Sequence, residues 1–200
     1  MSQASRASVM SSVDTRLIKR VSIADRNLNR TRGMEVGIGA FAFLFSEMLQ
    51  YAQKRVLGIQ DLERKLNDFG YRVGTRLLEL TVWREKNSKR ETRVLGILYF
   101  IHTTVWKALF GKQADSLEKS TEHEDEYNDP LISKYISVPK ELSQLNCNAF
   151  LAGIVEAILD GAQFPSRVTA HSLPQEGFPL RTTILIQLDK EILQREEQLK

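Results

Sequence analysis

The segment LNDFGYRVGTRLLEL, residues 66 to 80, has the apolar spacing of an α-helix but places Gly70 and Gly74 one turn apart inside it. A glycine in a helix interior costs about 0.5 to 1 kcal/mol relative to alanine, so the missing side chains must have a use. Small residues at this spacing allow a second backbone to come close. The sequence therefore predicts a close helix crossing at Gly70 and Gly74.

The 3.6-residue apolar period predicts two helices in this part of the chain. The first, within residues 36 to 56, has a broad inner stripe made of Ile38, Phe41, Leu44, Phe45, Met48, Leu49 and Ala52. Phe43 falls on the opposite, polar side, where it is either an incidental surface ring or a contact for a partner chain. The second helix, from Ile59 to Arg84, has an inner stripe made of Leu62, Leu66, Phe69, Val73, Leu77 and Leu80.

Residues 94 to 111, VLGILYFIHTTVWKALFG, predict a helix that is apolar on nearly every side. Such a helix is usually buried on every side. Because it is short and contains His102 and Lys107, it does not fit a membrane span. Its aromatic residues point in several directions, and they are Tyr99, Phe100, Trp106 and Phe110. The segment is either a central core helix or one that a partner subunit partly covers.

The second half of the chain mixes strands and helices. Residues 115 to 130, DSLEKSTEHEDEYNDP, are acidic and predict a solvated connector. The predicted strands are LISKYISVP, which follows the connector, and later SRVTA and TTILIQL. A fourth helix begins near Asn146 or Asn148, ends at Gly161 and carries a second row of small residues, Ala149, Gly153, Ala157 and Gly161; close packing is expected at Gly153. A short charged helix, DKEILQREEQLK, closes the chain, so the predicted fold is α+β, with helices packed beside a small antiparallel sheet.

The positive charge of the chain is concentrated at its start. Residues 1 to 33 hold seven Lys and Arg against two Asp, a net charge of +5, whereas the whole chain carries +3. We predict a flexible basic arm over residues 1–33 and a single domain over 34–200. A mitochondrial transit peptide is the alternative, although Asp14 interrupts its acid-poor pattern. The arm has no aromatic residue, so no nucleic-acid partner is expected.

Residue patterns for catalysis are scarce. His102, His123 and His171 are far apart in sequence and do not have the spacing of metal ligands. The segment FGKQADS lacks the first glycine of a phosphate loop, because Trp106 stands there. One cysteine, Cys147, excludes an intrachain disulfide and indicates a reducing compartment. The expectation is no catalytic residue, no metal and no cofactor.

Several stretches in order resemble the α/β class of core subunits of the trafficking protein particle complex, TRAPP. They are FAFLFSEMLQYAQKRV, LNDFGYRVGTRLLEL, RETRVLGILYFIHTTVWKALFGKQADSLE, PLISKYISVP and LNCNAFLAGIVEAILDGAQFPSRVTAH, within about residues 35 to 190. The pattern of Gly70, Gly74, Arg76 and Glu79 is similar to one shared by this class, and we take all four to belong to the close helix packing. The resemblance implies the α+β fold described above.

The resemblance also implies a function. It implies a non-catalytic subunit of a vesicle tether that is also a guanine-nucleotide exchange factor for Rab-type GTPases, in traffic between endoplasmic reticulum and Golgi and at the Golgi. Its partners would be other TRAPP core subunits and, through the assembled complex, a Rab-type GTPase. The chain would be cytoplasmic and peripheral at these membranes. Relatives pair through helical faces, and the expected interface residues here are Phe43, Tyr99, Phe100, Trp106 and Phe110.

Two departures limit what can be carried over. A related subunit bears an acyl chain on a cysteine near the end of the second helix, but the matching segment here, TVWREKNSKRE, contains no cysteine. Relatives also have a strand of mixed apolar residues where this chain has only STEHEDEYND, so the first strand of the usual hairpin is left open here.

Two other function classes remain open. One is a stand-alone binding module for a small hydrophobic ligand, with the rows of small residues lining an acyl-sized channel. The other is an unrecognised enzyme, which would need polar groups converging in a pocket.

Overall fold

The computed structural model describes residues 37–85, 90–119, 123–127, 132, 136–173 and 181–199. The predicted basic arm lies outside these residues, so its boundary with the domain stays a prediction. The helices among them are α1 (Ile38–Gln53), α2 (Ile59–Arg84), α3 (Val94–Phe100), α4 (Trp106–Phe110), α6 (Ala149–Gly161) and α7 (Lys190–Gln198). A π-helical turn, Ile101–Val105, joins α3 to α4, and Lys140–Leu142 forms a short 3-10 turn. The second and fourth predicted helices thus have the expected bounds.

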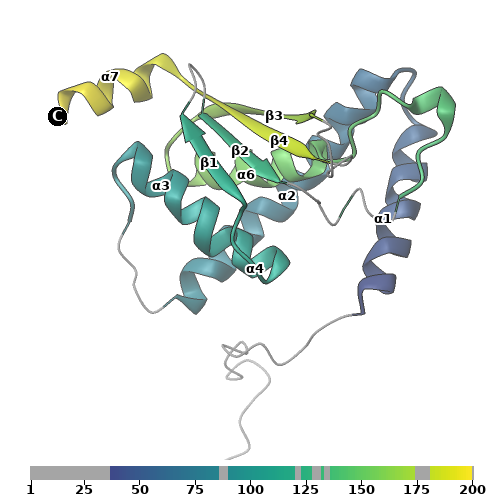
Figure 1. Cartoon of the computed structure of the whole chain (residues 1–200), viewed down its shortest axis with the longest axis horizontal. Coiled ribbons are helices and arrows are strands. Elements are labelled where there is room, and N and C mark those ends of the chain that lie inside the picture. Colours follow the sequence, from purple (N-terminus) through teal and green to yellow (C-terminus); the bar gives the residue numbers. More distant parts are fainter. Residues whose placement is uncertain are drawn as a thin grey trace, which may run out of the picture. The chain divides into compact units, whose positions relative to one another are not determined.

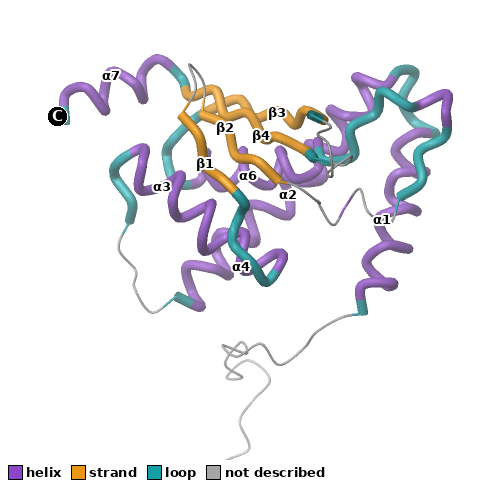
Figure 2. Tube along the Cα trace, in the orientation of Figure 1, coloured by secondary structure: helices purple, strands orange, loops and turns teal. Residues whose placement is uncertain are grey.

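Four antiparallel strands form one sheet in the order β1-β2-β4-β3 (Figure 2). They are β1 (Ser116–Lys119), β2 (His123–Tyr127), β3 (Ser166–Ser172) and β4 (Thr182–Leu188). Strand β4 is central because its Ile184 and Ile186 are fully buried and both of its edges are paired. The predicted α+β fold with a small antiparallel sheet is confirmed.

The acidic segment 115–130 was expected to be a solvated connector, and that expectation is wrong. β1 and β2 form a hairpin within it, and β2 pairs with β4 in the register Asp125↔Ile184. The reason is tertiary: β4 offers a free backbone edge over a buried apolar core, and this outweighs the low strand propensity of Asp and Glu.

The strand predicted over LISKYISVP is also wrong where the structure describes it. Residues 136–139 pair with no described strand. Ile132 is buried, while Ile136 and Val138 are half-buried and Ser137 is exposed. The segment keeps its alternating burial along the core, but alternation alone does not require a hydrogen-bonded neighbour.

Helices α2 and α6 pack along each other, and α6 also packs beneath β3 (Figure 1). From Ala149 to Leu159, every residue of α6 except Glu156 is buried. The helix buried on every side is therefore α6. In the segment 94–111, which was expected to have that role, Leu95 is 71% exposed and Tyr99 is 62% exposed.

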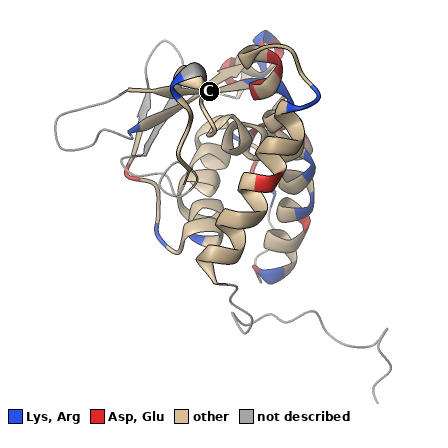
Figure 3. Ribbon diagram, turned by 90° about the vertical axis from the view of Figure 1, so that its right-hand side faces the viewer, with Lys and Arg blue, Asp and Glu red and all other residues tan. Residues whose placement is uncertain are grey.

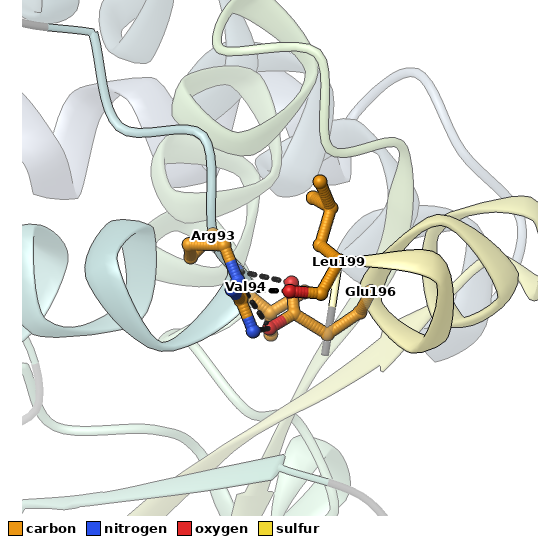
Figure 4. A network of polar contacts seen from close by, with 4 residues as sticks. All are labelled: Arg93, Val94, Glu196 and Leu199. Carbon is orange, nitrogen blue, oxygen red and sulfur yellow. Dashed lines mark hydrogen bonds and ion pairs between the residues drawn. The ribbon is translucent and has the colours of Figure 1, made fainter.

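The C-terminal helix α7 is tied to the start of α3 by one carboxylate (Figure 4). Glu196 accepts hydrogen bonds from the Arg93 Nε, at 2.8 Å, and from the Val94 backbone N–H, at 3.1 Å. Arg93 also donates to the Leu199 carbonyl oxygen at 3.0 Å. The Val94 hydrogen bond, followed by Arg93, lowers the pKa of Glu196 below its ordinary value, against the opposing effect of desolvation. Glu196 thus acts as a cap for a helix far away in the sequence.

Candidate functional site

The rows of small residues in α2 and α6 face each other. A methyl group on Gly74 would lie 2.5 Å from the Ile154 carbonyl oxygen. A methyl group on Gly70 would overlap the Phe150 carbonyl oxygen. In the other direction, a methyl group on Gly153 would overlap the backbone of Asn67. Backbone therefore fills the space that each of these three glycines leaves open.

Arg76 and Glu79, which the sequence placed in the same close packing, are exposed. The buried positions of α2 recur every four residues, at Leu62, Leu66, Gly70 and Gly74, and Thr81 continues this face. Val73, expected on the inner stripe, is 44% exposed. The inner face is centred on the glycines because they, and not the larger side chains, make the closest approach to α6.

Helix α1 packs Phe41, Met48 and Leu49 partly against the core but leaves several other large apolar side chains uncovered by the described residues. Only Phe45 and Ala52 are buried, whereas Phe43 is 78% exposed and Leu44 is 69% exposed. Glu47 is the one charged residue between Ile38 and Gln53, and Figure 3 shows the helix almost entirely without charge. The broad inner stripe predicted for this helix is therefore too wide, because Ile38 and Leu44 face outward. An exposed apolar helix face of this kind is typical of a partner interface.

The five predicted interface residues do not form one set. Phe43 and Tyr99 are exposed, while Phe100 and Phe110 are half-buried against the core. Trp106 is only 3% exposed and packs on Phe110, with the ring centroids 5.1 Å apart. Trp106 is thus a core residue of this chain and is removed from the candidate interface. Leu44 and Leu95 were not predicted, although Leu95 lies one turn before Tyr99 on the same side of α3.

The described residues offer little for catalysis. They contain no group of three or more His, Cys, Asp or Glu that could hold a metal ion. Burial raises the pKa of the Cys147 thiol to about 11, so very little thiolate is present at neutral pH. Burial also lowers the pKa of His102. His171 shares a 2.9 Å hydrogen bond with Thr169 on its own strand. None of the helices in the described part meets the length and hydropathy of a membrane span.

Comparison with known proteins adds the family. Residues 41–189 match the Transport protein particle (TRAPP) component family. Trafficking protein particle complex subunit 5 of Dictyostelium discoideum is 59% identical over 181 residues, which cover 88% of this chain and 96% of that protein. Human subunit 5 is 44% identical over 90% of this chain and 94% of its own length. Yeast subunit 31 is 31% identical over 81% of this chain and 79% of its own length.

A solved structure agrees on the fold. Subunit 3 from Naegleria fowleri, crystallised covalently bound to palmitic acid, superposes with a TM-score of 0.67 at 15% identity, over 76% of this chain and 95% of that one. Such low identity supports the fold alone. The family assignment depends on the sequence matches, which extend over nearly the whole domain and agree with the resemblance seen in the quoted segments. The chain belongs to the TRAPP component family and, within it, is similar to subunit 5.

Proposed function

We propose that this chain is a non-catalytic core subunit of a TRAPP complex, which holds neighbouring subunits in place within a Rab guanine-nucleotide exchange factor. Family membership supports assembly with other TRAPP subunits. The observation that carries the proposal is the outward face of α1, where Phe43 and Leu44 are exposed and Glu47 is the one charged residue. Aromatic and large apolar side chains in this setting are common anchors of protein interfaces.

Nucleotide exchange requires a binding surface for the GTPase and does not require that the exchange factor make or break covalent bonds. An exchange factor holds the nucleotide-free GTPase more tightly than the nucleotide-bound form, and this differential affinity shifts the GTPase toward nucleotide release. Apolar helix faces on a rigid scaffold are suited to that task. The absence of a metal-binding group among the described residues is compatible with this role but does not by itself support it.

Exchange rates measured with a fluorescent nucleotide test the proposal. The purified chain alone should leave the rate of release from a panel of Rab-type GTPases unchanged. A TRAPP core assembled without this subunit should dissociate or lose most of its activity, and adding the chain back should restore it. Full activity from a stable core that lacks the subunit would contradict the proposal.

The basic arm supports a second part of the proposal, which is peripheral contact with membranes of the endoplasmic reticulum and Golgi from the cytoplasmic side. Residues 1–33 carry a net charge of +5, and each basic residue near an anionic membrane surface contributes about 1 kcal/mol. Deleting residues 1–33 should weaken binding of the complex to vesicles containing phosphatidylserine, with a larger loss at 50 mM than at 300 mM salt, since salt screens the attraction. Equal binding with and without the arm at low salt would exclude this role.

The alternative of an acyl-binding module is not favoured. It depended on rows of small residues that could line a channel. At Gly70, Gly74 and Gly153, however, the backbone of the facing helix fills the space that a channel would need. Acylation of Cys147 is not favoured either, because the thiol is buried and its pKa is raised.

A further inference from the structure

An open groove of about 840 Å³ runs along strand β3, between this strand and helices α2 and α6. Its helical wall includes Glu63, Asn67, Asn146 and Glu156. A smaller hollow of about 330 Å³ shares Glu156 and Arg167 with it and extends to Asp160 and Asp189. The two hollows together follow β3 from its first residue to its last.

Strand β3 is an edge strand of the described sheet, since β4 is its one neighbour there. Hydrogen bonds at both ends fix which backbone groups face β4: Leu173 N–H donates to the Arg181 carbonyl oxygen at 2.9 Å, and Asp189 N–H donates to that of Pro165 at 3.1 Å. In an antiparallel ladder these paired positions alternate. Arg167, Thr169 and His171 therefore pair with β4, through the register Arg167↔Gln187, Thr169↔Leu185 and His171↔Thr183.

The intervening residues consequently turn their backbone N–H and C=O groups away from β4, and they are Ser166, Val168, Ala170 and Ser172. Residues from both faces of the strand line the groove, for example Val168 and Thr169, as expected where a groove follows a strand edge. Native edge strands are commonly protected by charged side chains, by proline or by a bulge. Of these devices β3, SRVTAHS, has one charged residue, Arg167, and it has no proline and no bulge in its pairing with β4.

The larger hollow alone is lined by Glu63 and Glu156 against two arginines, and Asp160 and Asp189 of the smaller hollow give the two together an acidic excess. The lining of both hollows contains four carboxylates, Glu63, Glu156, Asp160 and Asp189, against Arg64 and Arg167. Arg64 lies 3.3 Å from Asp61 on its own helix, which offsets part of its charge. Glu63 accepts from the Asn146 backbone N–H at 2.8 Å, Glu156 accepts from Asn67 at 3.2 Å, and Tyr71 donates to Asp160. These bonds hold the carboxylates in place along the wall.

Two polar side-chain atoms of the groove lack a hydrogen-bond partner in the part of the chain that the structure describes, although Asn146 Oδ1 accepts from the Asn148 backbone N–H at 2.9 Å. Asn146, which is 9% exposed and lines the larger hollow, has no acceptor for its Nδ2. Ser166, in the smaller hollow, has no partner for its Oγ. A buried polar group without a partner is costly, so a bound molecule that supplies one is favoured.

We propose that this groove binds an extended segment of another protein, which adds to the free edge of β3 as a fifth strand and places basic side chains against the acidic wall. Pairing of main-chain groups with an exposed strand edge, beside a helix that contacts the side chains, is an established way to bind peptides. At about 3.3 Å per residue, the seven residues of β3 accommodate six or seven residues of the segment. The inference does not depend on the proposed function.

The test uses the full-length ¹⁵N-labelled chain and a capped nine-residue peptide of alternating lysine and valine. We expect slowed hydrogen exchange and shifted amide signals at Val168, Ala170 and Ser172, whose N–H groups face the groove, and little change in exchange at Thr169 and His171, already paired with β4. A peptide of the same length with glutamate in place of lysine should bind at least about tenfold more weakly, because the wall is acidic.

Two variants separate the contributions. Ala170→Pro removes an N–H that faces the groove and leaves the β4 ladder intact, so peptide binding should fall at least about tenfold with little change in melting temperature. Glu63→Gln with Glu156→Gln keeps both acceptors but removes two charges, so affinity for the lysine peptide should fall and its salt dependence should shrink. The matched control is Glu191→Gln with Glu197→Gln, on exposed positions of α7, which should bind like the parent chain.

Three outcomes would overturn the proposal. One is no change at the three amides up to millimolar peptide, and another is equal binding of lysine and glutamate peptides. The third is protection of the same amides that rises with protein concentration without peptide, which would make a second copy of this chain the occupant.

Discussion

Helices α1 and α6 have similar apolar sequences but very different surroundings. Between Ile38 and Gln53, α1 has one charged residue, and α6 has only Glu156 and Asp160. Yet α6 is enclosed by α2 and the sheet, whereas α1 buries only Phe45 and Ala52 against the described residues. Apolar content therefore does not say whether a helix meets its own chain or a partner.

The glycines separate the two cases. The backbone of α6 lies where side chains of Gly70 and Gly74 would begin, whereas at Gly39 of α1 no described residue outside its own turn of helix comes within 4 Å of that point. A glycine that is costly to a helix is retained in α2 because the crossing requires it. The surface of α1 has no such counterpart among the described residues and is free for a partner subunit.

The largest expected effect is the loss of the α2–α6 crossing in Gly70→Leu. Overpacking typically costs about 1 to 3 kcal/mol, and here the obstacle is the backbone of Phe150, so we expect the upper end of that range or unfolding. The measurement is the midpoint of denaturant unfolding. Gly39→Ala is the control, and it should leave stability unchanged or raise it by up to about 1 kcal/mol. Unchanged stability in Gly70→Leu would exclude a close crossing.

The next effect concerns the outward face of α1. Phe43→Glu with Leu44→Glu should leave the melting temperature nearly unchanged, because both side chains are exposed, but should weaken binding to TRAPP partner subunits by about 2 kcal/mol or more. Co-purification and calorimetry with other TRAPP core subunits measure it. Trp106→Ala is the contrasting variant: it should lower stability by about 3 to 5 kcal/mol because Trp106 is a core residue. A double variant that binds normally would remove α1 from the interface.

These contrasts show what the sequence could and could not predict. The bounds of α2 and α6 follow from local signals, namely the apolar period and Gly161 at the end of α6. Asn148 stands at the expected cap position of α6, but its side chain makes no cap hydrogen bond and its Nδ2 donates to Thr182. Two other features do not follow from local signals: the exposure of Leu44 and the hairpin in the acidic segment 115–130. Each depends on which distant element lies next to it. For the same reason Trp106 could not be separated from Tyr99 by sequence, since both are aromatic residues of one apolar segment.

The groove beside β3 was not predicted at all. Its carboxylates come from α2, from α6 and from Asp189 before α7, which are far apart in the sequence. Its edge comes from a strand, SRVTAHS, that has no motif of its own. Predicting the groove from sequence would require knowing that α2 and α6 run parallel and that β3 lies at the edge of the sheet. Local periodicity shows neither.

The smallest expected effect lies at the contact between α3 and α7, where the polar link of Glu196 contrasts with the apolar faces discussed above. Glu196→Gln keeps the shape of the side chain but removes its charge. It should lower stability at pH 7 by about 1 kcal/mol, the usual value of a helix cap, or by roughly 2 to 4 °C in melting temperature.

The pH dependence gives this prediction its control. Because folding lowers the pKa of Glu196, its contribution is complete above the ordinary pKa of a glutamate, about 4.3, and is lost as pH falls through the lower value in the folded chain. The stability difference between the parent chain and Glu196→Gln should therefore be constant from pH 6 to 8 and shrink below about pH 4. Glu197→Gln, on the same helix but exposed, should leave the stability at pH 7 nearly unchanged. A difference that persists unchanged at low pH would mean that the carboxylate charge does not stabilise the start of α3, and that α7 is held by other contacts, such as buried Ile192 and the Arg93 hydrogen bond to the Leu199 carbonyl oxygen.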